Sequence, residues 1–111
     1  YILRGWAHVD EDEVEEGIAD FSEAIRLAPK ETLAYRLRGS TYMQAGDNEK
    51  AIADFTTVLK LQPKSVSAMH CRGIAFAAND DFELAITDYS RALKIEPENA
   101  EIWIDRGVAT R

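Results

Sequence analysis

The sequence repeats itself at a fixed interval. Prolines stand at positions 29, 63 and 97, so the spacing between the first two equals the spacing between the last two. The residues between them also repeat in type, because Gly39 and Phe55 in one repeat correspond to Gly73 and Tyr89 in the next. A fixed period of roughly 34 residues is typical of repeat proteins, in which each unit packs only on its neighbours. We therefore expect a stack of similar units rather than a fold built around one central core.

Each repeat is predicted to contain two helices. In the second half of one repeat the apolar residues Ala51, Phe55 and Val58 recur at helical spacing, and no stretch alternates apolar and polar residues as a strand would. Each proline ends a helix, since proline cannot continue a helix interior. Asn99 is predicted to cap the last helix. We predict an all-α protein with helices near residues 1–11, 14–27, 32–45, 48–61, 66–79, 82–95 and 100–110.

The repeats divide the chain into residues 1–31, 32–65, 66–99 and a partial repeat at 100–111, which together form a single domain. The first repeat lacks its opening residues and the fourth ends early. We therefore expect the chain to be a segment of a longer protein.

Composition excludes some classes of partner. The chain has 13 Lys and Arg against 20 Asp and Glu, a net charge of −7, whereas a nucleic-acid surface needs clustered basic residues. No apolar run reaches the roughly 18 residues of a membrane span, so we expect no membrane contact by this segment. The single cysteine, Cys71, rules out an intrachain disulfide and favours an intracellular location.

The pattern within each repeat resembles the tetratricopeptide repeat, in which a bulky residue, Leu-Gly, an aromatic residue, Ala-x-x-x-Phe and Pro recur over roughly 34 residues. The matching residues are Tyr1, Gly5, His8, Phe21 and Pro29, with Gly17 where alanine is usual; then Tyr35, Gly39, Tyr42, Ala51, Phe55 and Pro63; then Met69, Gly73, Phe76, Ala85, Tyr89 and Pro97; and finally Trp103 and Gly107. The resemblance covers the whole chain. It implies a right-handed α-solenoid of stacked antiparallel helix pairs.

The resemblance also implies that the first helix of each repeat lines a concave groove for peptides or helices of partner proteins. The groove positions are Ile2, Trp6, Val9 and Asp10 in the first repeat, Leu33, Arg36, Ser40, Met43 and Gln44 in the second, Ser67, His70, Ile74, Ala77 and Ala78 in the third, and Glu101, Ile104, Val108 and Arg111 in the fourth. This groove is largely apolar, with Arg36 and His70 as its basic groups. We predict a protein–protein interaction scaffold, with Trp6 as the main anchor for the partner.

One known binding mode of the family does not fit. Its chaperone-binding members hold a terminal carboxylate with a clamp of Lys, Asn and Arg side chains. The matching positions here carry Ile2, Trp6, Leu37, Ser67 and Cys71, none of the required type. Moving the register by one repeat gives Arg36, Ser40, Cys71, Glu101 and Asp105, which is also a poor match.

Charged residues recur where the family pattern has none. Arginine replaces the leucine before the glycine at Arg4, Arg38, Arg72 and Arg106, and aspartate precedes the aromatic residue of the second helix at Asp20, Asp54 and Asp88. We interpret the two sets as bidentate ion pairs between helices, with a row of anion-binding sites as the alternative. We favour pairing with the arginine of the next repeat, as in Asp20 with Arg38, Asp54 with Arg72 and Asp88 with Arg106, over pairing within one repeat.

The remaining reactive residues are interpreted as structural. His70 and Cys71 are neighbours on one helix, where side chains point about 100° apart and do not face each other. The acidic stretch from Asp10 to Glu16 lacks the glycine and glutamate that a calcium loop needs, and is predicted to form a turn and the start of a helix. We predict no catalytic residues, no cofactor and no metal.

Two alternative functions remain open. The chain could be a docking or regulatory arm of a larger enzyme. It could also be a self-assembly module whose open ends, at Tyr1 and at residues 103–108, stack on neighbouring copies.

Overall fold

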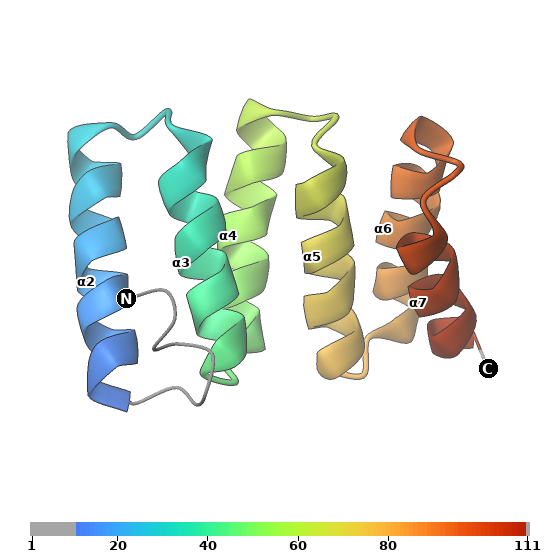
Figure 1. Cartoon of the computed structure of the whole chain (residues 1–111), viewed down its shortest axis with the longest axis horizontal. Coiled ribbons are helices and arrows are strands. Elements are labelled where there is room, and N and C mark those ends of the chain that lie inside the picture. Colours follow the sequence, from blue (N-terminus) through green and yellow to red (C-terminus); the bar gives the residue numbers. More distant parts are fainter. Residues whose placement is uncertain (1–10, 111) are drawn as a thin grey trace.

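The computed structural model describes residues 11–110, which form six helices (Figure 1). These are α2 (Glu11–Leu27), α3 (Thr32–Gln44), α4 (Asn48–Leu61), α5 (Val66–Ala78), α6 (Phe82–Ile95) and α7 (Ala100–Thr110). No strand occurs within residues 11–110, and the predicted all-α solenoid of antiparallel helix pairs is confirmed. None of these six helices is long and apolar enough to span a lipid bilayer.

The helices form two layers along the stack. Figure 1 shows α3, α5 and α7 in front of α4 and α6. α3 contacts α5, and α5 contacts α7, whereas α4 and α6 do not touch. The first helices of successive repeats therefore line the inner side of the stack, and we call α3, α5 and α7 the inner helices and α2, α4 and α6 the outer helices.

The start of α2 differs from the prediction. The helix begins at Glu11 rather than at residue 14, so most of the predicted acidic turn belongs to the helix. Carboxylates in the first turn of a helix are stabilised by the positive end of its dipole, which offsets their mutual repulsion. The helix predicted for residues 1–11 falls, up to residue 10, outside the described residues.

The turns that join the two helices of a repeat share one backbone conformation. Gly46 has a φ of 84° and Asp80, its equivalent in the next repeat, has a φ of 64°. This left-handed conformation suits glycine and is tolerated by aspartate. In both turns the N–H of the following residue donates to the carbonyl five residues back at 2.8 Å, which closes the end of the inner helix.

Polar side chains cap the starts of several helices. The Asn99 Oδ1 accepts from the Ile102 N–H at 3.4 Å, which confirms the predicted cap of α7. In the same way, the Ser65 Oγ accepts from the Ala68 N–H at 3.3 Å at the start of α5. Each cap satisfies an N–H that the helix itself leaves without a partner.

Within each repeat, an aromatic ring lies directly on a glycine. The rings of Phe55 and Tyr89 are almost fully buried in the core. A Cβ on Gly39 would lie 3.0 Å from the Phe55 ring, and a Cβ on Gly73 only 2.6 Å from the Tyr89 ring. The missing side chain therefore lets the inner and outer helices approach closely enough to bury the ring.

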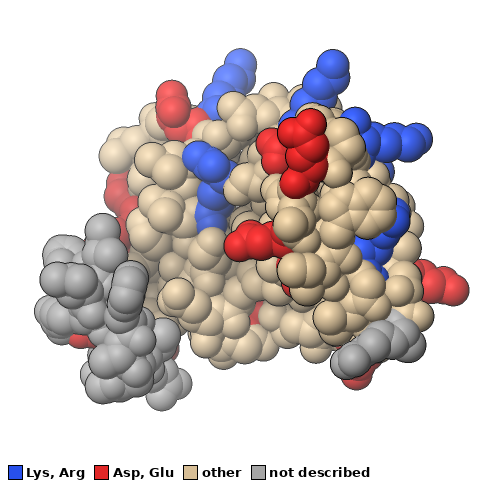
Figure 2. All heavy atoms as spheres, turned by 45° about the vertical axis from the view of Figure 1, so that its right-hand side comes forward, with Lys and Arg blue, Asp and Glu red and all other residues tan. Residues whose placement is uncertain are grey.

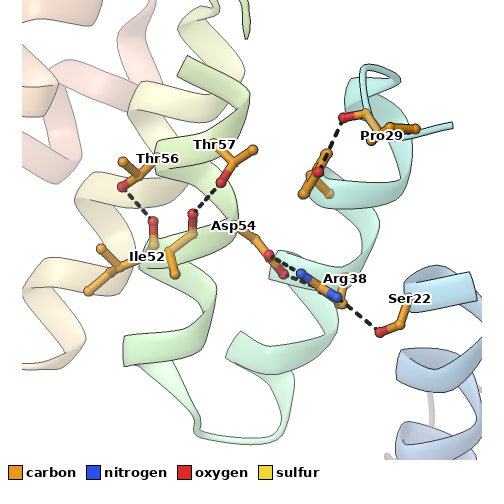
Figure 3. A network of polar contacts seen from close by, with 9 residues as sticks. Ser22, Pro29, Arg38, Ile52, Asp54, Thr56 and Thr57 are labelled. Carbon is orange, nitrogen blue, oxygen red and sulfur yellow. Dashed lines mark hydrogen bonds and ion pairs between the residues drawn. The ribbon is translucent and has the colours of Figure 1, made fainter. Parts of the chain in front are cut away.

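The recurring arginines join three helices. Arg38 of α3 donates from Nε and Nη2 to the two carboxylate oxygens of Asp54 in α4, at 2.8 and 2.7 Å, and from Nη1 to the Ser22 Oγ in α2 at 2.9 Å (Figure 3). Arg72 repeats the pattern with Asp88 at 2.7 Å and with the Thr56 Oγ1 at 3.2 Å. The hydrogen bond to Asp54 raises the pKa of the Arg38 guanidinium, against the opposing effect of burial.

The predicted ion pairs are therefore present, but the favoured pairing was wrong. Arg38 and Arg72 each bind the aspartate of their own repeat. A hydroxyl of the preceding outer helix takes the place assigned to the preceding aspartate: Ser22, Thr56 and Ser90 for Arg38, Arg72 and Arg106. The same-repeat partner of Asp20 would be Arg4, which lies outside the described residues. The inner-to-outer contact within one repeat is the most extensive helix contact, so it brings the two charges together.

Breaking one of these pairs is expected to destabilise the fold. Asp54 is only 4% exposed, so Arg38→Met should strand a buried carboxylate and lower the free energy of unfolding by about 3 kcal/mol. A double-mutant cycle on Arg38 and Asp54, measured by urea unfolding, should give a coupling energy of about 1 kcal/mol or more. The matched cycle on Asp54 and Arg72, the pairing favoured from sequence, should give almost none. Equal coupling in both cycles would contradict the observed pairing.

The two glycines Gly73 and Gly107 should respond oppositely to alanine. Gly73→Ala places a methyl group against the buried Tyr89 ring and should cost about 1–3 kcal/mol of stability. A Cβ at Gly107 meets nothing within 4 Å, so Gly107→Ala should stabilise α7 by about 0.5–1 kcal/mol through its better helix propensity. Thermal unfolding of both variants checks the contrast, and a similar loss in both would refute the close-approach role of Gly73.

Candidate partner-binding groove

The predicted groove residues that the structure describes in the second and third repeats lie on two adjacent inner helices. Helix α3 carries Leu33, Arg36, Ser40, Met43 and Gln44, and α5 carries Ser67, His70, Ile74, Ala77 and Ala78. Because α3 contacts α5, the two helices that carry these residues lie next to each other in the stack. The described residues do not include Ile2, Trp6, Val9, Asp10 or Arg111, so their place in the groove stays a prediction.

Three of the predicted groove residues are large apolar side chains that are exposed to solvent. Leu33 on α3 is 55% exposed, and Ile104 and Val108 on α7 are 64% and 58% exposed. Folding leaves these side chains in water, although burying each of them would be favourable by about 1.5–3 kcal/mol. An apolar surface at these positions can bind a partner without any rearrangement of the core.

Two of the predicted apolar groove residues also serve the core. Met43 is half-buried and packs against the cluster formed by Ala51, Phe55 and Ala75. Ile74 is half-buried and packs against the neighbouring cluster that contains Tyr89. The core therefore holds both side chains in place, whereas Leu33 is exposed.

Arg36 is the basic group that the groove offers to a ligand. Its side chain is half-buried, and its Nε is shielded from solvent without a hydrogen-bond partner among the described residues. A buried donor without a partner is unusual in a folded protein and costs free energy. This atom is out of reach of a ligand on the surface, so a ligand would have to pair with the rest of the guanidinium.

His70 is already engaged by a carboxylate that the sequence analysis did not pair with it. Its Nε2 lies 2.6 Å from the Asp105 Oδ2, which links α5 to α7 across repeats. The His70 ring also meets the Tyr89 ring edge-on, with centroids 6.0 Å apart. Burial, together with the charges of Asp105 and Asp88, raises the pKa of Tyr89 to about 12, so its hydroxyl stays protonated at neutral pH. His70 therefore links α5 to α7, and its side chain is already paired with Asp105 instead of being free to bind a ligand.

Charge is distributed unevenly over the surface. Figure 2 shows Lys and Arg side chains gathered toward the upper edge, where the α2–α3, α4–α5 and α6–α7 connections lie in Figure 1. Arg26, Lys60 and Lys94 stand in the last turns of the three outer helices, where they complement the negative end of the helix dipole. Basic residues at this edge are therefore explained by their role in stabilising the C-terminal ends of the outer helices.

The Cys71 side chain is half-buried and packs against the core cluster of Ala51, Phe55 and Ala75. Burial raises the pKa of its thiol, and this effect outweighs the opposite influences of a hydrogen bond with Ser67 and of the Arg36 charge. A nucleophilic cysteine needs a lowered pKa, because the thiolate is the reactive form. His70 is the preceding residue on α5, where neighbouring side chains point about 100° apart, and its Nε2 meets Asp105 rather than this thiol.

The reactivity of Cys71 should reflect this environment. We expect iodoacetamide to alkylate it at least about tenfold more slowly at pH 8 in the folded chain than in urea-unfolded chain, because less thiolate forms and access is reduced. The pH profile of the alkylation rate should have its midpoint above the ordinary thiol value of 9.0. A midpoint near neutral pH would reopen the nucleophile interpretation.

The family models agree with the repeat pattern. A model described as "Tetratricopeptide repeat" matches residues 2–69, and a second, described as "TPR repeat", matches residues 75–110. No match was found among curated protein sequences.

Solved structures with the same fold include peptide complexes. The first TPR of Spaghetti (RPAP3) bound to the HSP90 peptide SRMEEVD has a TM-score of 0.85 and 24% identity, and the match covers 90% of this chain and 79% of that one. The second TPR domain of human RPAP3 in complex with the HSP70 peptide SGPTIEEVD has a TM-score of 0.84 and 22% identity, with 91% and 84% covered. The Arabidopsis OM64 TPR domain has a TM-score of 0.82 and 22% identity, with 88% and 81% covered. Since one family model spans more than half of the sequence, the chain belongs to the tetratricopeptide repeat family.

Proposed function

We propose that this chain is a protein-interaction scaffold whose inner face holds a peptide or helix of a partner protein. The observation that carries the proposal is the set of exposed apolar side chains Leu33, Ile104 and Val108 on the inner helices. Exposed apolar side chains can mark an interaction surface. The outer helices expose Leu27, Phe82, Leu84 and Ile95 as well, so the choice of the inner face rests also on the tetratricopeptide pattern. Arg36 adds one charged side chain, which can form directional hydrogen bonds with a ligand.

The family and its complexes support a polypeptide ligand. Tetratricopeptide folds are typically non-catalytic binding modules, and two domains of the same fold are known with bound HSP90 and HSP70 peptides. We propose that this segment likewise has no catalysis of its own. Whether it serves as the docking arm of a larger enzyme depends on sequence that flanks it.

The ligand chemistry proposed here differs from that of the HSP90 and HSP70 peptides. The chain carries Leu37, Ser67 and Cys71 at clamp positions, and these side chains supply no cation for a terminal carboxylate. A ligand suited to this face brings apolar side chains that contact Leu33, Met43 and Ile74. It brings one carboxylate, which pairs with the Arg36 guanidinium. Apolar burial supplies most of the affinity, and the ion pair sets the orientation.

The test is a selection of peptides from a phage-displayed library on the immobilised chain, followed by titration calorimetry. Selected peptides should be apolar with at least one Asp or Glu. Leu33→Ala and Arg36→Ala should each weaken binding by about 1–2 kcal/mol, as expected for interface anchors.

Matched controls lie on the outer helix α6. Leu84 is 50% exposed, close to the value for Leu33, so Leu84→Ala removes a similar side chain from the opposite layer. Arg91→Ala is the corresponding control for Arg36, and neither control should change affinity. The HSP90 peptide SRMEEVD should bind much more weakly than the selected peptides. Peptides that lose affinity with Leu84→Ala but not with Leu33→Ala would refute the inner-face proposal.

A further inference from the structure

The two boundaries between inner helices carry different residues at equivalent positions. Where α5 meets α7, the His70 Nε2 lies 2.6 Å from the Asp105 Oδ2. One repeat earlier, the same two positions are Arg36 on α3 and Cys71 on α5. Burial raises the pKa of the Cys71 thiol and the Arg36 charge opposes this effect, which places Arg36 close to Cys71. Because a thiol supplies no carboxylate, Arg36 lacks at its boundary the partner that His70 has at the next one.

The charge of Arg36 is not compensated from elsewhere on the inner helices. Neither α3 nor α5 contains an Asp or Glu. Arg36 forms no ion pair with any residue between 11 and 110. The arginines of the repeating series differ from it, because they reach the outer helices at Asp54, Asp88 and Ser90. Arg36 therefore gives the α3 end of the inner face a positive charge.

Helix α7 gives the other end of the inner face a negative charge. Glu101 stands in its first turn, is exposed, and makes no ion pair within the described part of the chain. Asp105 lies one turn further on, with its side chain 36% exposed. His70 contacts the Oδ2 of Asp105, and the described residues supply no partner for its Oδ1. Helix stability does not require these carboxylates, because α3 and α5 have no acidic residue in the first turn.

The exposure of Glu101 is a property of its position in the repeat. Its equivalents are Leu33 on α3 and Ser67 on α5, and both are exposed. Ser67 is exposed although α5 contacts α3 on one side and α7 on the other (Figure 1). A side chain at this position is therefore accessible to a ligand even where the stack continues in both directions.

We propose that the inner face selects a ligand segment with two opposite charges, an acidic residue that pairs with Arg36 and a basic residue that pairs with Glu101 and Asp105. This inference rests on the proposed function, and it adds the second charge and the direction in which the ligand lies. A ligand in the reverse direction would place like charges next to each other, which is strongly unfavourable at an interface.

The spacing of the two charges follows from the stack. Arg36 lies where α3 meets α5, and Asp105 lies where α5 meets α7, so the two sites are one helix apart. The axes of packed helices are about 8–10 Å apart. An extended chain rises about 3.3 Å per residue and a helix about 1.5 Å. The acidic and basic residues should therefore be about three positions apart in an extended ligand and about six in a helical one.

The test compares a peptide selected on the immobilised chain with an exchanged peptide, in which the acidic and basic residues trade places. Composition, length and net charge are then identical. In titration calorimetry at low salt the selected peptide should bind at least about fivefold more tightly than the exchanged one. The ratio should shrink in about 1 M NaCl, because salt screens the charges and leaves the apolar contacts in place.

Variants of the chain test which residues set the direction. Arg36→Glu combined with Glu101→Lys should reverse the preference, so that the exchanged peptide binds more tightly. Circular dichroism checks that this double variant folds. Glu101→Lys alone alters an exposed side chain and should reduce the ratio of the two affinities, which keeps the test valid if the double variant unfolds. The matched control is Glu83→Lys, the same change in the first turn of the outer helix α6, and it should leave the ratio unchanged.

Leu33→Ala separates this inference from the proposed groove, because it should weaken both peptides to the same extent. If it does so while the selected and exchanged peptides bind the wild-type chain equally, the two-charge inference is overturned and the groove stands. Selected peptides without any Lys or Arg would also overturn it. If Leu33→Ala leaves both affinities unchanged, the groove itself is refuted, together with the inference that rests on it.

Discussion

The close approach of an inner and an outer helix within each repeat is the contact on which the rest of the structure depends. Two neighbouring inner residues make it: Arg38 reaches Asp54, and Gly39 receives the Phe55 ring. The ring can be buried because the glycine has no side chain. The two helices then lie close together, so the charges can meet. Hydrophobic packing and a buried ion pair thus stabilise the same strip of surface.

Most of the architecture follows from the sequence, because periodicity and helix signals agree. The fixed spacing of the prolines and glycines predicted the number, order and approximate bounds of the described helices. It did not predict which aspartate each arginine binds. Arg38 is nearly as far along the chain from Asp20 as from Asp54, so a repeat pattern fits either pairing, and only the closer packing within a repeat decides between them. The start of α2 was missed for a different reason: acidic residues suit both a turn and the first turn of a helix.

The candidate groove was predictable in position but not in its internal contacts. The family pattern placed Leu33 and Arg36 on the first helix of their repeat, which is α3 in the structure, and their contact with a partner stays a prediction. The contact between His70 and Asp105 could not be found in this way, since the repeats carry no acidic residue at the positions equivalent to Asp105. A contact that occurs once leaves no periodic signal, although it removes one of the two basic groups on which the predicted binding surface relied.

Arg38 and Arg72 each bind side chains of two repeats. Arg38 binds the outer helix of its own repeat through Asp54 and the outer helix of the preceding repeat through Ser22. In a linear array, stability is the sum of what each unit contributes and what each boundary contributes. Such an arginine contributes both to the stability of its own repeat and to the stability of the boundary with the preceding repeat. Unfolding one repeat alone would therefore also lose the boundary contacts, which raises the free energy of that partly folded state. Adjacent repeats should therefore open together, as one cooperative block of amides in hydrogen exchange.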